Sequence, residues 1–137
     1  MRLLCIDFGL KFVGVAVADF PGITARALDT IRADRGNIMP QLAEIIRRES
    51  VTRIVIGFPY SDIEGDIHRT IHGFRDEVQS AFSAIPAEYA DESYSSQEAD
   101  ELLSETRLGR RKKTRAQDSE AAKIVLLRYL RLHEENY

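Results

Sequence analysis

The chain has 137 residues, of which 44% are hydrophobic and 30% charged, and its formal net charge is −3 at neutral pH. These values are typical of one globular domain spanning residues 1–137, and the negative balance excludes a protein that coats nucleic acid through bulk positive charge. No apolar run reaches the roughly 18 residues of a membrane span and no signal-peptide pattern opens the chain, so we expect a cytoplasmic protein with no membrane partner.

The first part of the chain predicts an antiparallel meander of three strands. Leu3–Phe8 and Phe12–Ala18 are apolar runs joined by a tight turn, in which Gly9 is expected to use its freedom to adopt positive φ. Thr24–Ile31 follows a proline-glycine turn and adds the third strand. The only cysteine, Cys5, lies inside the first run and is expected to be a buried small hydrophobe.

Two helices and a buried strand are predicted next. Apolar residues at helical spacing indicate a helix from about Asn37 to Arg48. Arg53–Pro59 is a continuous apolar run, typical of a buried parallel strand. A second helix is expected from about Asp66 to Phe82, with an apolar face made of Ile67, Ile71, Phe74 and Val78. His68 and His72 stand one turn apart and are expected on its polar face rather than in a metal site.

The last third of the chain predicts one more strand and two helices. The strand is Ile85–Ala90, a short acidic helix runs from Gln97 to about Glu105, and the last helix runs from about Gln117 to His133. The resulting order is β-β-β-α-β-α-β-α-α. It predicts an α/β fold with a five-stranded mixed sheet, in which parallel strands extend the antiparallel meander and helices flank the faces.

Acidic residues mark the ends of three predicted elements. Asp7 closes the first strand, Asp91 and Glu92 follow the fifth, and Asp118 begins the last helix. Open α/β sheets place their sites at such ends, and clustered carboxylates suit Mg²⁺ or Mn²⁺, two of which can support phosphodiester cleavage. Side chains alternate along a strand, so at most one of Asp91 and Glu92 joins the site. The alternatives are an N-cap role for Asp118 and a solvated strand end for Asp91 and Glu92.

A basic stretch precedes the last helix. Six of the nine residues from Arg107 to Arg115 are lysine or arginine. Five of them are candidate nucleic-acid-binding residues: Arg110, Arg111, Lys112, Lys113 and Arg115. A solvated loop is one explanation of this stretch, and contact with a phosphate backbone beside the carboxylates is the other.

Six segments in order resemble the YqgF family, also called RuvX, which has a ribonuclease-H-like fold. They are CIDFGLKFVGVAVAD, GITARALDTI, IVIGFP, DESYSSQEA, RRKK and DSEAAKIVLLRYL, and together they cover essentially the whole chain. The resemblance implies a bacterial nuclease that matures the 5′ end of precursor 16S ribosomal RNA, with resolution of four-way DNA junctions as the alternative activity. It implies structured RNA, junction DNA or ribosomal precursor particles as partners.

The resemblance also assigns roles to residues. It makes Asp7, Glu92 and Asp118 the catalytic metal ligands for two divalent ions, with Asp91 a neighbouring candidate. Lys11 matches the turn lysine of the family and is expected to meet a phosphate. Phe12 and Ser93 stand where family members usually have arginine, which motivates a third alternative, a non-catalytic nucleic-acid-binding or ribosome-assembly factor. Junction resolution requires two active sites and hence a homodimer, whereas RNA cleavage is compatible with a monomer.

Overall fold

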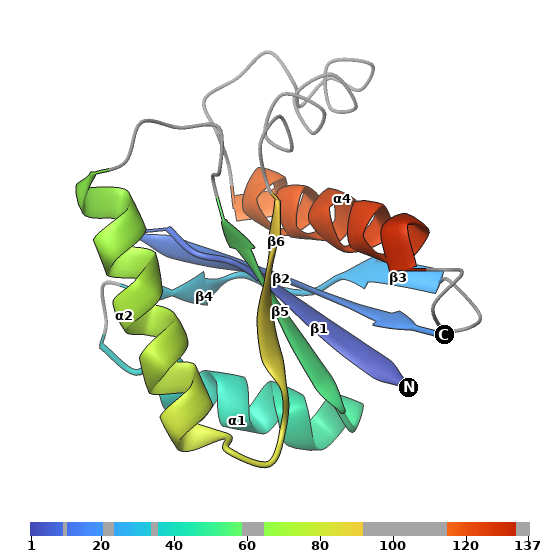
Figure 1. Cartoon of the computed structure of the whole chain (residues 1–137), viewed down its shortest axis with the longest axis horizontal. Coiled ribbons are helices and arrows are strands. Elements are labelled where there is room, and N and C mark those ends of the chain that lie inside the picture. Colours follow the sequence, from blue (N-terminus) through green and yellow to red (C-terminus); the bar gives the residue numbers. More distant parts are fainter. Residues whose placement is uncertain (10, 21–23, 34–35, 59–64, 92–114, 134–137) are drawn as a thin grey trace.

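The computed structural model describes residues 1–9, 11–20, 24–33, 36–58, 65–91 and 115–133. A twisted sheet lies between helices α1 and α2 on one face and helix α4 on the other (Figure 1). The strands are β1 Arg2–Asp7, β2 Phe12–Asp19, β3 Thr24–Ala27, β4 Ile31–Arg32, β5 Arg53–Phe58 and β6 Ala87–Asp91. The helices are α1 Ile38–Glu49, α2 Asp66–Ala81 and α4 Arg115–His133.

The sheet is mixed and confirms the predicted α/β class. Its strand order is β3-β2-β1-β5-β6, with β4 pairing to β2 beside this path. The pairs of β2 with β1, β3 and β4 are antiparallel, whereas β5 is parallel to both β1 and β6. The antiparallel meander is therefore extended by parallel strands, as the order of elements predicts.

The predicted third strand is divided into β3 and β4, so the sheet has six strands rather than five. Ala27 pairs with Ala16 and Ile31 pairs with Val13, so residues 28–30 face only residues 14 and 15 of β2. One extra residue on one side of a ladder is a bulge, which interrupts regular pairing and bends the strand. The amide of Leu28 still donates to the carbonyl of Val15 at 2.9 Å, which keeps the interrupted segment against β2.

Two hydrophobic clusters cover the two faces of the sheet. Side chains alternate along β1, so Leu4 and Ile6 pack with residues of α1 and α2, while Leu3 and Cys5 pack with residues of α4. Cys5 is fully buried, which confirms it as a small core residue. None of the helices in the described part of the chain is both long and apolar enough to cross a bilayer.

The buried face of α2 differs by one residue from the prediction. Its buried residues are His68, Ile71, Phe74 and Val78, whereas Ile67 is exposed. The imidazole of His68 lies over the ring of Phe58, with centroids 4.9 Å apart, and its Nδ1 accepts the amide N–H of Gly65 at 3.1 Å. The prediction of a polar-face His68 is wrong because this hydrogen bond satisfies the ring nitrogen inside the protein. His72 is exposed, as predicted.

Candidate functional site

The ends of β1, β5 and β6 lie at one edge of the sheet because the three strands are parallel. Ile6 of β1 pairs with Ile56 of β5, and Phe58 of β5 pairs with Asp91, the last residue of β6. Asp7 follows Ile6 as the last residue of β1. The chain therefore places acidic residues at the ends of two strands that flank β5, at the edge where open α/β sheets hold their sites.

Asp7 is half-buried and lies on the α4 side of the sheet. It shares strand parity with Leu3 and Cys5, which pack against α4. Its partner across the antiparallel pair is Gly14 of β2. A glycine at this position means that β2 places no side chain beside the carboxylate.

Helix α4 covers the same face. Ala122, Val125, Leu126, Tyr129 and Leu130 are buried against it. Position 118 lies four residues before Ala122 and seven before Val125, which places it on the same stripe of the helix, toward the N-terminal end. Because α4 begins at Arg115, Asp118 lies within the first turn and is not the N-cap.

A polar network fixes α4 to the sheet. The Tyr129 hydroxyl donates a hydrogen bond to Glu88 Oε1. The Arg53 Nη1 lies 3.0 Å from the same oxygen. Tyr129 is buried, and the network joins α4 to β5 and β6. These two partners explain why the charged residue Glu88 stands inside β6, which neighbouring residues in the sequence do not explain.

In the turn between β1 and β2, the backbone of Gly9 lies close to the backbone of Phe12. A Cβ atom on Gly9 would lie 2.4 Å from the carbonyl oxygen of Phe12. Among the described glycines only Gly36 has positive φ, at 70°, so the expected reason for Gly9 is wrong. The reason is steric: only a residue without a side chain allows this approach.

Two cations lie beside the ring of Phe12. Lys11 Nζ is 5.7 Å from the ring centroid, and the guanidinium carbon of Arg32 is 5.6 Å from it. Arg32 is the Cα partner of Phe12 in the β2–β4 pair. The sequence predicts Lys11 as a phosphate contact but does not predict Arg32, because only the β2–β4 register brings Arg32 beside Phe12.

The remaining predicted site residues either lie outside the described residues or are placed by their backbone alone. Glu92, Ser93, Arg110, Arg111, Lys112 and Lys113 lie outside the described residues, as does the predicted helix Gln97–Glu105. Asp91 and Arg115 are placed by their backbone, at the end of β6 and the start of α4. Within the described ranges, no three histidine, cysteine, aspartate or glutamate side chains are grouped to hold a metal ion. The ligand set of Asp7, Glu92 and Asp118 stays a prediction.

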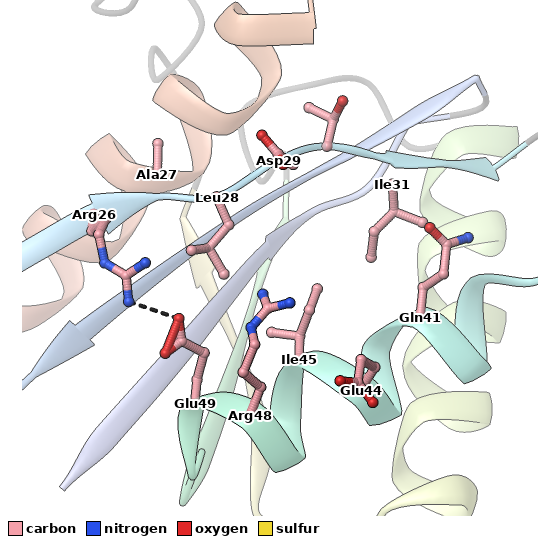
Figure 2. Close-up of a pocket in the computed structure, with 11 residues that line it drawn as sticks. Arg26, Ala27, Leu28, Asp29, Ile31, Gln41, Glu44, Ile45, Arg48 and Glu49 are labelled. Atoms are coloured by element: carbon pink, nitrogen blue, oxygen red, sulfur yellow. Dashed lines mark hydrogen bonds and ion pairs between the residues drawn. The ribbon is translucent and has the colours of Figure 1, made fainter.

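A separate groove lies on the other face of the sheet (Figure 2). It encloses about 530 Å³ between α1 and the segment that joins β3 to β4. An ion pair crosses it, with Arg26 Nη2 2.7 Å from Glu49 Oε1. Ile31 and Ile45 at its base belong to the cluster under α1 and α2. The groove is therefore on the side of the sheet opposite Asp7.

Comparisons with known proteins agree with this fold. A family model described as RuvX, Holliday junction resolvase, matches residues 1–132. A Streptococcus agalactiae protein named "Putative pre-16S rRNA nuclease" is 32% identical over 136 residues, which cover 95% of this chain and 97% of that protein. A Syntrophus aciditrophicus protein of the same name is 36% identical over 133 residues, covering 95% and 88%.

Solved structures show the same architecture at low sequence identity. RuvC of Thermus thermophilus in complex with Holliday junction substrate aligns with a TM-score of 0.65 at 20% identity, covering 96% of each chain. The Holliday junction resolvase of fowlpox virus aligns with a TM-score of 0.61 at 14% identity, covering 96% of this chain and 99% of the viral protein. These likenesses establish the fold.

Proposed function

The chain belongs to the RuvX family of Holliday junction resolvases, and from this premise we propose that it is a divalent-metal-dependent endonuclease that processes the 5′ end of precursor 16S ribosomal RNA. The observation that carries the proposal is Asp7, a half-buried carboxylate at the end of β1, opposite a glycine and on the face covered by α4. The names of the relatives from Streptococcus agalactiae and Syntrophus aciditrophicus support ribosomal RNA as the substrate.

Strand alternation favours Glu92 over Asp91 as the second ligand. Glu88 and Ala90 contact α4 or its cluster, whereas Ala87 and Tyr89 pack with the cluster under α1 and α2. The even-numbered positions of β6 therefore face α4, on the same side as Asp7, and this parity is the reason for proposing Glu92.

Helical spacing supports Asp118 as the third ligand. It continues the stripe of α4 that contains Ala122 and Val125, both packed with Cys5 in one cluster. Asp7 lies two residues after Cys5 on the same face of β1. Position 118 therefore belongs to the face of α4 that packs on the Asp7 side of the sheet.

The proposed ligands fit hard divalent cations. Asp7, Glu92 and Asp118 would supply carboxylate oxygens, which Mg²⁺ and Mn²⁺ prefer, and Gly14 places no side chain beside Asp7. When bound, two such ions would supply the Lewis acidity that activates water and neutralises charge at the leaving oxygen. Lys11 and the basic stretch Arg110, Arg111, Lys112, Lys113 and Arg115 would hold the phosphate backbone against the carboxylates.

A cleavage assay tests the proposal. Purified protein is incubated with a precursor 16S RNA that carries its 5′ extension, with Mg²⁺ or Mn²⁺. We expect discrete products that Asp7→Asn abolishes and that Asp76→Asn preserves. Asp76 is a matched control because it carries the same charge and its side chain is 78% exposed on α2. Equal cleavage by the Asp7→Asn protein would refute the assigned role of Asp7.

The family description motivates a second candidate function, resolution of four-way DNA junctions. An immobile four-way junction is assayed in parallel, together with the mass of the protein in solution. Paired cuts by a homodimer would favour the resolvase, whereas RNA cleavage by a monomer that leaves junctions intact would favour the RNA nuclease. Binding of either substrate without cleavage in any divalent metal would favour a ribosome-assembly factor.

A further inference from the structure

We propose that Lys11, Phe12 and Arg32, here called the Phe12 cluster, form a phosphate-binding subsite for the substrate strand. The inference rests on the proposed nuclease function, because it adds a contact at the same edge of the sheet. It assigns a substrate-binding role to Arg32, and it assigns Phe12 the role of holding the two cations.

Strand register places the cluster on the same face as Asp7. Val13 pairs with Ile31, and both are buried in the cluster under α1 and α2. The next pair, Phe12 with Arg32, therefore points to the opposite face, where α4 lies. Asp7 lies on that face as well, and its partner Gly14 stands two residues from Phe12 on β2. No side chain of β2 intervenes on this face between the carboxylate and the Phe12 ring.

The separation suits one nucleic-acid strand. From Asp7 to Arg32 the path crosses two strand spacings and two residues along β2, roughly 12 Å for ordinary sheet dimensions. That distance corresponds to a few nucleotides along a backbone. A phosphate at the Phe12 cluster would thus belong to the strand that is cut at the carboxylates, and it would fix the register of that strand.

The ring of Phe12 restrains the cations that flank it. Both charged groups lie within 6 Å of the ring centroid, at 5.7 Å for Lys11 Nζ and 5.6 Å for the Arg32 guanidinium carbon. Attraction between a cation and an aromatic face acts at this range. The backbone adds a second restraint, because the amide of Ala33 donates to the carbonyl of Lys11 at 2.8 Å. The two cations are thereby held together at the turn.

The positive charges of the Phe12 cluster favour phosphate binding beside the carboxylates. The chain is negative overall, and the carboxylates of the proposed site repel a polyanion. A guanidinium and an ammonium beside the site offset this repulsion locally, and the guanidinium matches phosphate geometry with two parallel hydrogen bonds. Phe12 itself carries no charge, so Lys11 and Arg32 supply the positive charge beside its ring.

Salt-dependent binding tests the subsite. In the Asp7→Asn background, which keeps the substrate uncut, binding of a fluorescein-labelled RNA hairpin with a single-stranded 5′ extension is measured by anisotropy in Mg²⁺ over a series of KCl concentrations. Arg32→Gln should lower the slope of log K against log salt by about 0.7 and weaken binding about fivefold near 0.1 M salt. Phe12→Leu should weaken binding about two- to fivefold with the slope retained.

Arg48→Gln is the matched control. Arg48 is exposed near the end of α1 and lines the groove on the other side of the sheet, so its removal should change neither slope nor affinity. Arg32→Lys should retain the slope. If Arg32→Gln fails to fold in a thermal unfolding test, Lys11→Gln replaces it with the same expected change in slope.

The outcomes separate the subsite from the proposed function. An Arg32→Gln slope equal to that of Arg48→Gln would overturn the subsite, while RNA cleavage by the parent protein would leave the nuclease proposal intact. A parent protein that neither binds nor cuts the RNA or a four-way junction would overturn both.

Discussion

Replacing Gly9 by alanine should destabilise the protein and distort the turn beside Asp7. The added Cβ would lie 2.4 Å from the Phe12 carbonyl oxygen, well inside any normal contact between carbon and oxygen. The obstacle is the backbone of Phe12, which is held by the pairing of β2 with β4, so the clash is relieved only by moving the turn. Overpacking of this kind costs about 1–3 kcal/mol. For a chain of 137 residues this loss lowers Tm by about 3–10 °C.

The same substitution at Gly73 is the control and should have the opposite sign. Gly73 lies within α2, and a Cβ built there meets nothing within 4 Å. Alanine is favoured over glycine in a helix by about 1 kcal/mol, so Gly73→Ala should raise Tm by about 3 °C. Both variants are compared with the parent by thermal unfolding followed by circular dichroism. A Gly9→Ala protein at least as stable as the parent would refute the steric account of the turn.

Four further substitutions test the packing and charges of the fold. Leu126→Ala opens a cavity under α4 and should lower the free energy of unfolding in urea by about 2–5 kcal/mol. Leu132→Ala, at a position that is 71% exposed, should change it by less than about 0.5 kcal/mol. Glu49→Gln weakens ion pairs to two arginines and should cost about 0.5–2 kcal/mol in low salt and less in high salt. The Arg47 guanidinium lowers the pKa of the Glu44 carboxyl by donating a hydrogen bond to it and by its positive charge. The pair therefore stabilises the fold at pH values above the ordinary carboxyl pKa. This stabilisation is lost as the pH falls through the lowered pKa of Glu44. In an NMR titration Arg47→Gln should return the pKa of Glu44 toward normal, and an unchanged value would contradict the assigned cause.

The sequence predicts those residues of the candidate site that lie at the ends of strands or helices. Asp7 is conspicuous because it interrupts an apolar run, and its place at the end of β1 follows from that run. Arg32 and Glu88 could not be predicted in this way. Each acquires its neighbours through contacts between segments far apart in the chain, Arg32 through pairing of β4 with β2 and Glu88 through docking of Tyr129.

The sequence by itself determined the type and order of the described elements. Alternation and helical spacing are local properties, so they place the strands and helices to within a few residues of their observed bounds. Tertiary structure decided the rest: the bulge that divides β3 from β4, the burial of His68 in place of Ile67, and the register that sets Arg32 beside Phe12. These features depend on which surfaces meet, and a side chain with a satisfied hydrogen bond or a close-fitting neighbour can be buried where local polarity alone predicts exposure.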